Sequence, residues 1–215
     1  MSGTPVQRIL VASGNAKKLA ELRALCADLP IEVLGPEALP AGLDEVEEDG
    51  QTFLDNAVKK ARAAAEQAAE ALGPDTWALA DDSGLCVDAL EGAPGVHSAR
   101  WAGVSGDGRD AANNARLLEE LAGRHGDERA AEFRCVLAVA RRNELLFAVE
   151  GRVRGTILEA PDGEQGFGYD PLFYHGPSAC SFARLPADAK AAVSHRGEAV
   201  ARLRRVLETV LPNPS

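Results

Sequence analysis

The sequence predicts an α/β fold with a mixed β-sheet, and two observations support this. In the first half of the chain, short apolar runs alternate with helical patterns, as they do in parallel βα units. Further along, the apolar stretches 132–141 and 145–153 flank a turn at Arg142 and Asn143, which predicts an antiparallel hairpin. A chain of 215 residues is long enough to bury a full core, so we expect one domain over residues 1–215.

The first elements follow from apolar spacing and from residues that end helices. Residues 9–12 form a short apolar run, which predicts a strand, and residues 16–29 show helical spacing that ends before Pro30. A second strand is expected at 31–34, followed by a loop rich in proline, glycine and acidic residues. Thr52, with Asp55 three residues later, predicts the start of an alanine-rich helix that ends near residues 73–74.

The second half adds a strand, the hairpin and two more helices. The apolar strand 77–80 is expected to end in the sequence ADDSG, and Asp110 is expected to cap a helix that ends near Gly123. The glycine-rich segment 163–170 is expected to precede a loop, which continues up to the last predicted helix. Ser194 begins the last predicted helix, whose apolar side consists of Val200, Leu203, Val206, Leu207 and Val210.

Composition and charge exclude several classes of protein. With 33 acidic and 23 basic side chains, the net charge is −10, which disfavours non-specific binding to nucleic acid. No apolar stretch approaches the roughly 20 residues that span a bilayer, and no secretory signal is apparent. The four cysteines lie far apart, as expected for free thiols in a reducing compartment. We therefore expect a cytoplasmic protein with neither a membrane nor a nucleic-acid partner.

The segment 13–18, SGNAKK, joins the first strand to the first helix and has the character of a phosphate-binding turn. A glycine lets backbone N–H groups approach an anion, the helix N-terminus adds a positive dipole, and a lysine adds a full charge. A plain strand-to-helix turn with surface lysines would show the same pattern. The spacing matches neither a P-loop nor a GxGxxG fingerprint.

Acidic residues cluster at two places where metal chemistry is expected. Asp81 and Asp82 follow an apolar strand, and ligands of open α/β sheets bind beyond the carboxyl ends of strands. Their hard oxygen atoms suit Mg²⁺, and a carboxylate beside such a metal can accept a proton from water. Glu47 and Glu48 precede the second helix, on which Asn56 and Lys60 share one face. The alternative is a solvated helix face with an acidic entry loop.

Two later segments have the residue types that bind a nucleotide base. The segment 166–171, GFGYDP, places aromatic rings among glycines, which suits a base stacked on a ring, although a tight turn is the alternative. Lys190 precedes the sequence SHRG at 194–197, which places cationic groups at the positive end of the last helix. A histidine at a helix start also commonly has a purely structural role.

These motifs, SGNAKK, the acids before TFLDNAVKKA, ADDSG with APGVHSARWAG, GFGYDP, and a lysine before SHRG, occur in one order over residues 9–207. In this they closely resemble the inosine triphosphate pyrophosphatase family, also called XTP/dITP diphosphatases. The resemblance implies Mg²⁺-dependent hydrolysis of ITP, dITP and XTP to the monophosphate and pyrophosphate by a homodimer. It also implies an elongated, two-lobed fold with a long mixed central sheet flanked by helices, and a cleft between the lobes.

The resemblance assigns roles to individual residues. Asp82 would be the proton acceptor and a metal ligand, with Asp81 beside it and Glu48 or Glu47 as the second acidic contact. Lys18 would supply charge to the triphosphate, and Phe167 would stack on the base. The other residues expected to contact the substrate are Ser13, Gly14, Asn15, Ala16, Lys17, Asn56, Lys60, Ser83, Gly168, Tyr169, Asp170, Lys190, His195 and Arg196.

Two alternatives to this function stay open on the sequence. The same phosphate-binding residues would serve a pyrophosphatase that acts on other modified nucleotides. A non-hydrolytic sensor of purine nucleotides would also need motifs for phosphate and base. The carboxylates of Glu48, Asp81 and Asp82 are more than triphosphate binding alone requires, which favours an enzyme.

Overall fold

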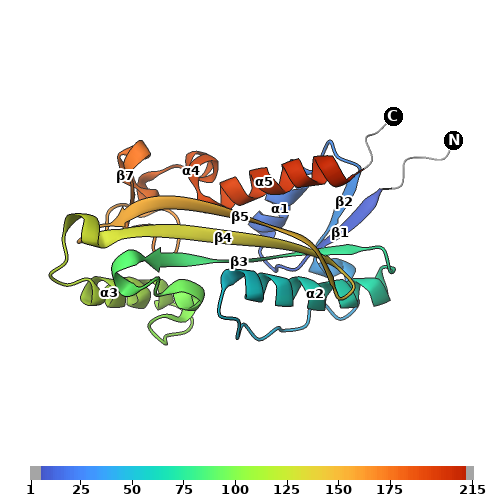
Figure 1. Ribbon diagram of the computed structural model, residues 1–215, viewed down its shortest axis with the longest axis horizontal. Coiled ribbons are helices and arrows are strands. Elements are labelled where there is room, and N and C mark those ends of the chain that lie inside the picture. Colours follow the sequence, from blue (N-terminus) through green and yellow to red (C-terminus); the bar gives the residue numbers. More distant parts are fainter. Residues whose placement is uncertain (1–5, 212–215) are drawn as a thin grey trace. The chain divides into compact units, whose positions relative to one another are not determined.

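The computed structural model describes residues 6–211 and confirms a mixed sheet flanked by helices (Figure 1). Seven strands in the described part of the chain form one sheet in the order β2-β1-β3-β4-β5-β6-β7. The pairs β2-β1 and β1-β3 are parallel, whereas β5-β6 and β6-β7 are antiparallel. The strands are β1 (Gln7–Val11), β2 (Ile31–Leu34), β3 (Trp77–Val87), β4 (Ala130–Arg141), β5 (Glu144–Ile157), β6 (Phe173–His175) and β7 (Cys180–Ser181).

Five α-helices lie in the same part of the chain, and none of them is long and apolar enough to cross a membrane. They are α1 (Ala16–Leu25), α2 (Phe53–Ala71), α3 (Arg109–Glu120), α4 (Ala187–Val193) and α5 (His195–Val210). The predicted capping box of α2 is confirmed: the Asp55 N–H donates to Thr52 Oγ1 over 3.1 Å, and the Thr52 N–H donates to Asp55 Oδ2 over 3.0 Å. Helix α1 ends at Leu25 rather than at residue 29, because Cys26 leaves the helical conformation.

The chain forms two compact units. The first unit contains the chain up to Asp82, residues 136–150 and the chain from Ala199 onward, and the second contains residues 83–135 and 151–198. The strands β3, β4 and β5 contribute residues to both units, so the division does not follow the ends of secondary-structure elements.

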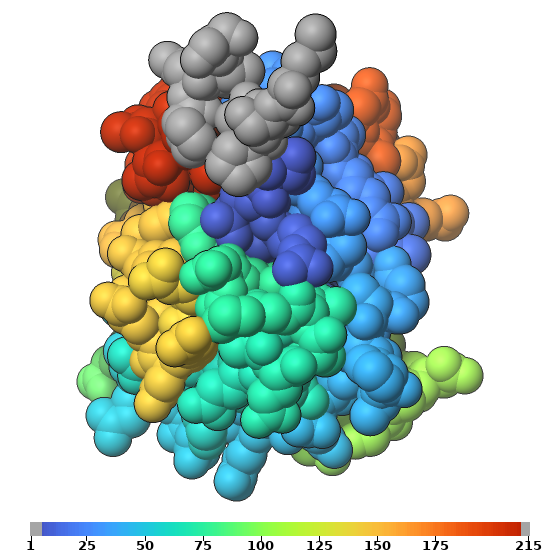
Figure 2. Space-filling view, turned by 90° about the vertical axis from the view of Figure 1, so that its right-hand side faces the viewer, coloured from blue at the N-terminus to red at the C-terminus, as the bar shows by residue number. Residues whose placement is uncertain are grey.

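In the first unit, α1 and α2 cover opposite faces of the sheet (Figure 1). Helix α2 buries an alanine stripe that includes Ala57, Ala61 and Ala64, so its backbone can lie close to the strands. On α5, Leu203 and Leu207 are buried as predicted, but Val210 is 49% exposed, so the predicted apolar side extends too far. Figure 2 shows the end of this unit, where the turn between β4 and β5 lies beside the segment that follows α2.

In the second unit, the core is formed by aromatic and aliphatic side chains from strands, α3 and the segment around β6. Phe133, Phe173 and Phe182 are buried together with Leu117 of α3 and Leu121, the residue that follows this helix. The sequence predicted a loop where β6, β7 and α4 lie, and that expectation is wrong. Strands of two or three residues and a seven-residue helix carry too little periodicity to be detected in the sequence.

Two predicted element boundaries are corrected. Strand β3 does not end before Asp81 but continues to Val87, because Gly84, Leu85 and Val87 are buried and extend its apolar pattern. Asp110 does not cap α3, since the N-cap is Gly108, whose φ of +92° favours glycine, and Asp110 lies in the first turn.

Candidate functional site

The turn that joins β1 to α1 is held by its own side chains. Asn15 is the N-cap of α1, and its Oδ1 accepts hydrogen bonds from the N–H groups of Lys17 and Lys18 at 3.0 and 3.3 Å. Ser13 Oγ accepts from the Asn15 N–H at 3.3 Å. A Cβ atom placed on Gly14 would meet no atom within 4 Å, so space for a ligand lies beside this turn. Asn15 therefore shapes the turn with its carbonyl oxygen, a capping role that the sequence did not predict for it.

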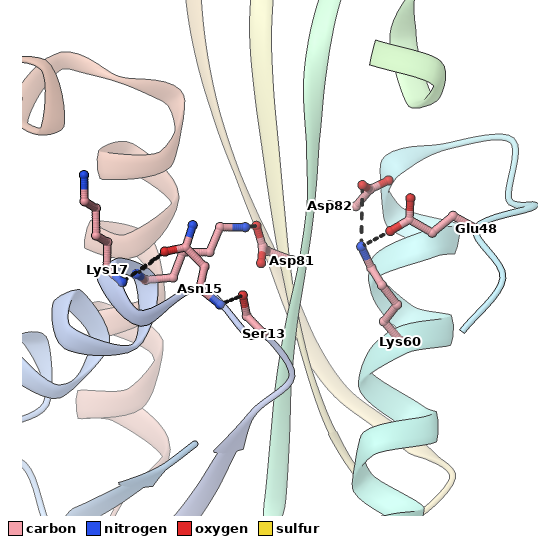
Figure 3. Close-up of polar contacts among 8 residues, drawn as sticks. Ser13, Asn15, Lys17, Glu48, Lys60, Asp81 and Asp82 are labelled. Carbon is pink, nitrogen blue, oxygen red and sulfur yellow. Dashed lines mark hydrogen bonds and ion pairs between the residues drawn. The ribbon is translucent and has the colours of Figure 1, made fainter. Parts of the chain in front are cut away.

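Asp81 and Asp82 lie on opposite faces of β3, as adjacent residues of a strand must (Figure 3). Asp81 accepts from Lys18 Nζ of α1 over 2.6 Å. Asp82 lies on the side of α2. The expectation that Asp81 stands beside Asp82 at one metal is therefore corrected: the strand continues through both residues and directs their side chains apart. Lys17 is exposed and points away from both carboxylates (Figure 3).

Lys60 of α2 lies between two carboxylates (Figure 3). Its Nζ is 2.7 Å from Glu48 Oε1 and 3.6 Å from Asp82 Oδ1, and only 19% of its side chain is exposed. Glu48 reaches this place from the acidic loop that precedes α2, whereas its neighbour Glu47 is exposed. Of the two glutamates that the sequence left open, the structure therefore brings Glu48 to Asp82.

Asn56 fixes the geometry of this cluster. It is fully buried, its Nδ2 donates to Asp82 Oδ2 over 3.0 Å, and its Oδ1 accepts from the Gly50 N–H over 2.8 Å. A Cβ atom on Gly50 would lie 2.6 Å from Asn56 Oδ1, so the loop needs glycine for this approach. Both polar atoms of Asn56 bind within the protein, so its expected contact with phosphate falls to the second N–H of Nδ2 and stays a prediction. Asn56 links the acidic loop to Asp82 and holds the carboxylate in one orientation.

The cluster of Glu48, Asp82 and Lys60 fits a divalent cation in its donor chemistry. Two carboxylates converge on one ammonium group, and hard oxygen donors of this kind are those that Mg²⁺ prefers. Two protein carboxylates match the usual Mg²⁺ site, in which waters and phosphate oxygens complete the octahedron. The described residues contain no group of three or more His, Cys, Asp or Glu side chains that could hold a metal ion together. The protein alone would therefore supply only part of the coordination sphere.

The second unit contains a pocket of about 210 Å³. This is smaller than the roughly 300 Å³ at which sites for drug-sized ligands begin, and it suits a single heteroaromatic ring system. Ser83, predicted to contact substrate, lies at this pocket. The lining consists of Ser83, Gly84, Ser98, Ala99, Arg109, Asp110, Asn113, Phe133, Phe167, Gly168, Tyr169, Asp170, Lys190 and His195.

Phe167, Asp170 and Lys190 form the polar and aromatic edge of this pocket. The Phe167 ring is 76% exposed, which is unusual for a large apolar side chain, and Lys190 Nζ lies 4.5 Å from its centroid. Lys190 also donates to Asp170, whose carboxylate accepts the Phe167 N–H over 2.8 Å. Burial raises the pKa of Asp170, and the ammonium of Lys190 acts in the opposite direction. We infer that the Asp170 carboxylate orients Lys190.

Two glycines of the predicted motifs are required by close approaches. A Cβ atom on Gly166, whose φ is +81°, would lie 2.1 Å from Asp170 Oδ2. A Cβ atom on Gly197 would lie 1.8 Å from the carbonyl oxygen of Ala191, so glycine allows the first turn of α5 to approach α4. Lys190 of α4 and His195 of α5 consequently line the same pocket.

His195 and Arg196 begin α5, after Ser194, whose Oγ accepts from the Gly197 N–H over 3.1 Å. This confirms Ser194 as the start of the helix. The His195 ring stacks on Phe133, with 4.8 Å between centroids and 16° between planes. Arg196 is half-buried and is not one of the described residues that line the pocket.

The sequence did not identify several residues that build the pocket. Phe133 was hidden because one aromatic residue in an apolar strand is typical of a core. The sequence analysis also gave no site role to three polar residues of α3, Asp110, Asn113 and Asn114, because polar residues at helical spacing are typical of a solvent-exposed helix face. The one available signal was that the sequence DAANNA places Asp110 and Asn114 four residues apart, on one side of a helix.

Comparison with known proteins finds relatives over nearly the whole chain. Residues 9–206 match the model of the Ham1 family. A dITP/XTP pyrophosphatase of Desulforamulus reducens is 48% identical over 93% of this chain and 95% of its own, and one of Geobacter sulfurreducens is 47% identical over 92% and 94%. The solved structure of a HAM1 protein from Coxiella burnetii superposes with a TM-score of 0.85 at 39% identity, covering 95% of this chain and all of that one.

Proposed function

The chain belongs to the Ham1 family, and from this premise we propose that it hydrolyses the deaminated purine nucleotides dITP, XTP and ITP to the monophosphate and pyrophosphate. Relatives that are 43–48% identical over most of the chain are dITP/XTP pyrophosphatases, which places this protein among the hydrolases of nucleotide metabolism. The residues expected to contact phosphate belong to the first unit, and Phe167, Lys190 and His195, expected to contact the base, belong to the second.

For the triphosphate, the first unit offers cations beside an open helix start. Lys18 and Lys60 each lie in an ion pair with a carboxylate, so their ammonium groups are already fixed in position. The turn 13–16 adds backbone N–H groups and the positive end of the α1 dipole. A phosphate chain that displaces these internal ion pairs would keep the lysines charged and directed at its oxygens.

We propose that Glu48 and Asp82 hold Mg²⁺. When bound, this ion would neutralise charge on the triphosphate and lower the pKa of a coordinated water. Two carboxylates that converge on one place support this assignment, because Mg²⁺ prefers hard oxygen donors of this kind.

Asp82 is the proposed proton acceptor. Its Oδ2 is held by Asn56, so the carboxylate has a fixed orientation, and its Oδ1 is on the side of Lys60. The oxygen of a water would bond to the α-phosphorus, the bond from that phosphorus to the bridging oxygen would break, and pyrophosphate would leave. The carboxylate of Asp82 would take the proton of the water, and Lys18 and Lys60 would stabilise the charge on the leaving group.

In the second unit, Phe167 would stack on the base, and Lys190 and His195 would donate to its edge. Hypoxanthine and xanthine have an oxygen acceptor at position 6, where adenine has an amino donor. Asp170 fixes the position of the Lys190 ammonium, which is a hydrogen-bond donor. If adenine bound, this donor would face the amino group at position 6, which is also a donor. Such a mismatch costs far more than a missing apolar contact, so ATP should be rejected strongly.

The observation that carries the proposal is the convergence of Glu48 and Asp82 on Lys60, because triphosphate binding alone has no need of two carboxylates. The test is chromatographic analysis of products after incubation with Mg²⁺ and, separately, ITP, dITP, XTP, GTP, ATP and a pyrimidine triphosphate. Monophosphate plus pyrophosphate from the first three, with ATP largely intact, is expected. A different preferred base would support a pyrophosphatase for other modified nucleotides. Tight binding without turnover would support a sensor.

We also propose a homodimer, as the resemblance to the inosine triphosphate pyrophosphatase family implies, and a place in the cytoplasm, where four widely spaced free cysteines would stay reduced. Light scattering coupled to size-exclusion chromatography would measure the mass of the assembly, for which twice the chain mass of 22.6 kDa is expected. A monomer at micromolar concentration would contradict this assignment.

A further inference from the structure

Helix α3 holds one residue of the pocket edge by both of its backbone polar groups. Asp110 Oδ2 accepts the Gly168 N–H over 2.7 Å, and Asn114 Nδ2 donates to the Gly168 carbonyl oxygen over 2.9 Å. Asp110 and Asn114 are four residues apart, so they project from the same side of the helix. Gly168 is therefore fixed in position and direction by side chains of one rigid element.

Gly168 lies between the two aromatic residues of the GFGYDP segment, Phe167 and Tyr169. Since 76% of Phe167 is exposed, little of its ring is packed against the protein, so its place depends on the backbone on either side. On one side the Phe167 N–H donates to Asp170 over 2.8 Å, and on the other the Gly168 backbone is held by α3. The φ of +61° at Gly168 allows the chain to turn back so that both contacts form.

The same helix holds another wall of the pocket through Asn113. Its Oδ1 accepts the Ala102 N–H over 2.7 Å, and its Nδ2 lies 3.2 Å from the Ser98 carbonyl oxygen and 3.3 Å from that of Ala99. Ser98 and Ala99 line the pocket, and the Tyr169 hydroxyl donates to the Ser98 carbonyl over 2.9 Å. One turn of α3 thus links the segments 98–102 and 167–169.

Asn114 has a further property that stability does not explain. Its Oδ1 is buried and has no hydrogen-bond partner among the described residues. A buried acceptor without a partner destabilises the folded state, so asparagine is not the side chain that folding stability would favour here. The contact with the Gly168 carbonyl oxygen requires a hydrogen-bond donor at this position, and Asn114 Nδ2 supplies it.

We propose that Asp110 and Asn114 are positioning residues that set the place of Phe167, and through it the affinity for the purine base, without taking part in phosphate chemistry. The proposal rests on the function proposed above, in which Phe167 stacks on the base. It predicts that removing either side chain weakens recognition of the base while binding of a bare polyphosphate is unchanged.

The test compares Asp110→Ala and Asn114→Leu with wild type. We expect each to weaken binding of inosine monophosphate by about tenfold in calorimetry, which corresponds to about 1.4 kcal/mol, and to raise KM for ITP more than it lowers kcat. Binding of inorganic tripolyphosphate should stay within twofold of wild type. The Tm of Asn114→Leu should change little, since removal of a buried acceptor without a partner offsets the lost hydrogen bond to the Gly168 carbonyl.

Two controls separate positioning from a general loss of structure. Asp107→Ala removes one negative charge from the exposed loop before α3 and should bind inosine monophosphate as wild type does. Asp110→Asn keeps a side-chain oxygen that can accept the Gly168 N–H, and it should recover most of the affinity lost in Asp110→Ala.

A double-mutant cycle with Phe167→Ala tests the route of the effect. If Asp110 and Asn114 act through Phe167, their substitution should have less than a twofold further effect once the ring is gone. Additive losses would overturn the proposal, and so would wild-type affinity in both single variants. If wild type itself neither binds inosine monophosphate nor hydrolyses ITP, the proposed function fails, and this inference fails with it.

Discussion

The two units hold their functional side chains in different ways. In the first unit the charged groups expected to bind phosphate and metal come from α1, β3, α2 and the loop before α2, and they form ion pairs with one another: Lys18 with Asp81, and Lys60 with Glu48 and Asp82. In the second unit the pocket edge is a glycine-rich turn whose backbone is held by side chains of α3 and by Asp170. Ion pairs between side chains predominate in the first set, and hydrogen bonds to backbone groups predominate in the second.

This difference corresponds to the two parts of a nucleotide. A triphosphate is highly charged and common to all nucleotides, so ion pairs that keep lysines and carboxylates in place are sufficient to bind it. A base must be distinguished from close analogues by the pattern of its donors and acceptors, which requires a pocket with exact geometry. Substitutions in the first unit should therefore reduce the rate for every substrate, and those in the second should change which substrate is used.

The largest expected effect is that of Asp82→Asn. Replacing the proposed proton acceptor by an isosteric amide should lower kcat for ITP by roughly 10² or more, a typical cost for losing a general base. Steady-state kinetics at saturating ITP and Mg²⁺ measure this. Asp81→Asn is the matched control, because Asp81 lies on the other face of β3 and contacts Lys18, so its effect should be clearly smaller. Equal losses in both variants would argue against the assignment of Asp82.

Next in size is the effect of Glu48→Gln on metal dependence. If Glu48 is a metal ligand, the Mg²⁺ concentration for half-maximal activity should rise about tenfold or more, since even indirect partners of metal ligands contribute that much. A titration of activity with Mg²⁺ at fixed ITP measures it. Asp49→Asn changes the neighbouring carboxylate, which is paired with the exposed Lys59, and should leave the titration unchanged. An unchanged midpoint for Glu48→Gln would exclude Glu48 as a ligand.

Phe167→Ala should have an effect on affinity rather than on turnover. Stacking of a base on an aromatic ring contributes about 1–3 kcal/mol, so KM for ITP should rise by roughly tenfold while kcat changes less. Because the ring is 76% exposed, the Tm should shift little. A fall in kcat without a change in KM would show that Phe167 does not contact the base.

The smallest expected effect concerns Tyr169 at alkaline pH. Burial raises the pKa of Tyr169 well above its usual value, so the folded protein keeps this proton at a pH where the unfolded chain has lost it. Stability should therefore fall as pH rises above about 10, the usual tyrosine pKa. Tyr169→Phe removes the hydrogen bond to Ser98 and should lower the free energy of unfolding at neutral pH by about 0.5–1.5 kcal/mol. In urea unfolding, the stability of this variant should fall less steeply with alkaline pH than that of wild type. If the stability of wild type and of Tyr169→Phe fell equally steeply with alkaline pH, this prediction would be contradicted.

The sequence by itself determined the local features of this protein. The alternation of strands and helices, the Thr52 capping box, the hairpin turn at Arg142 and Asn143 and the last helix from Ser194 all depend on residues close together in the chain, so their patterns were readable. The motifs that resemble the inosine triphosphate pyrophosphatase family were readable for the same reason. Each of these motifs consists of residues that lie within a few positions of one another in the chain.

Only the tertiary structure decided which side chains meet. It separated Asp81 from Asp82 by continuing β3 through both, because neighbouring residues of a strand point to opposite faces. It linked Asn56 to both Gly50 and Asp82, and it brought Asp110 and Asn114 to Gly168 across more than 50 residues of chain. Such contacts depend on how elements pack, and the spacing of residues along the chain does not contain that information.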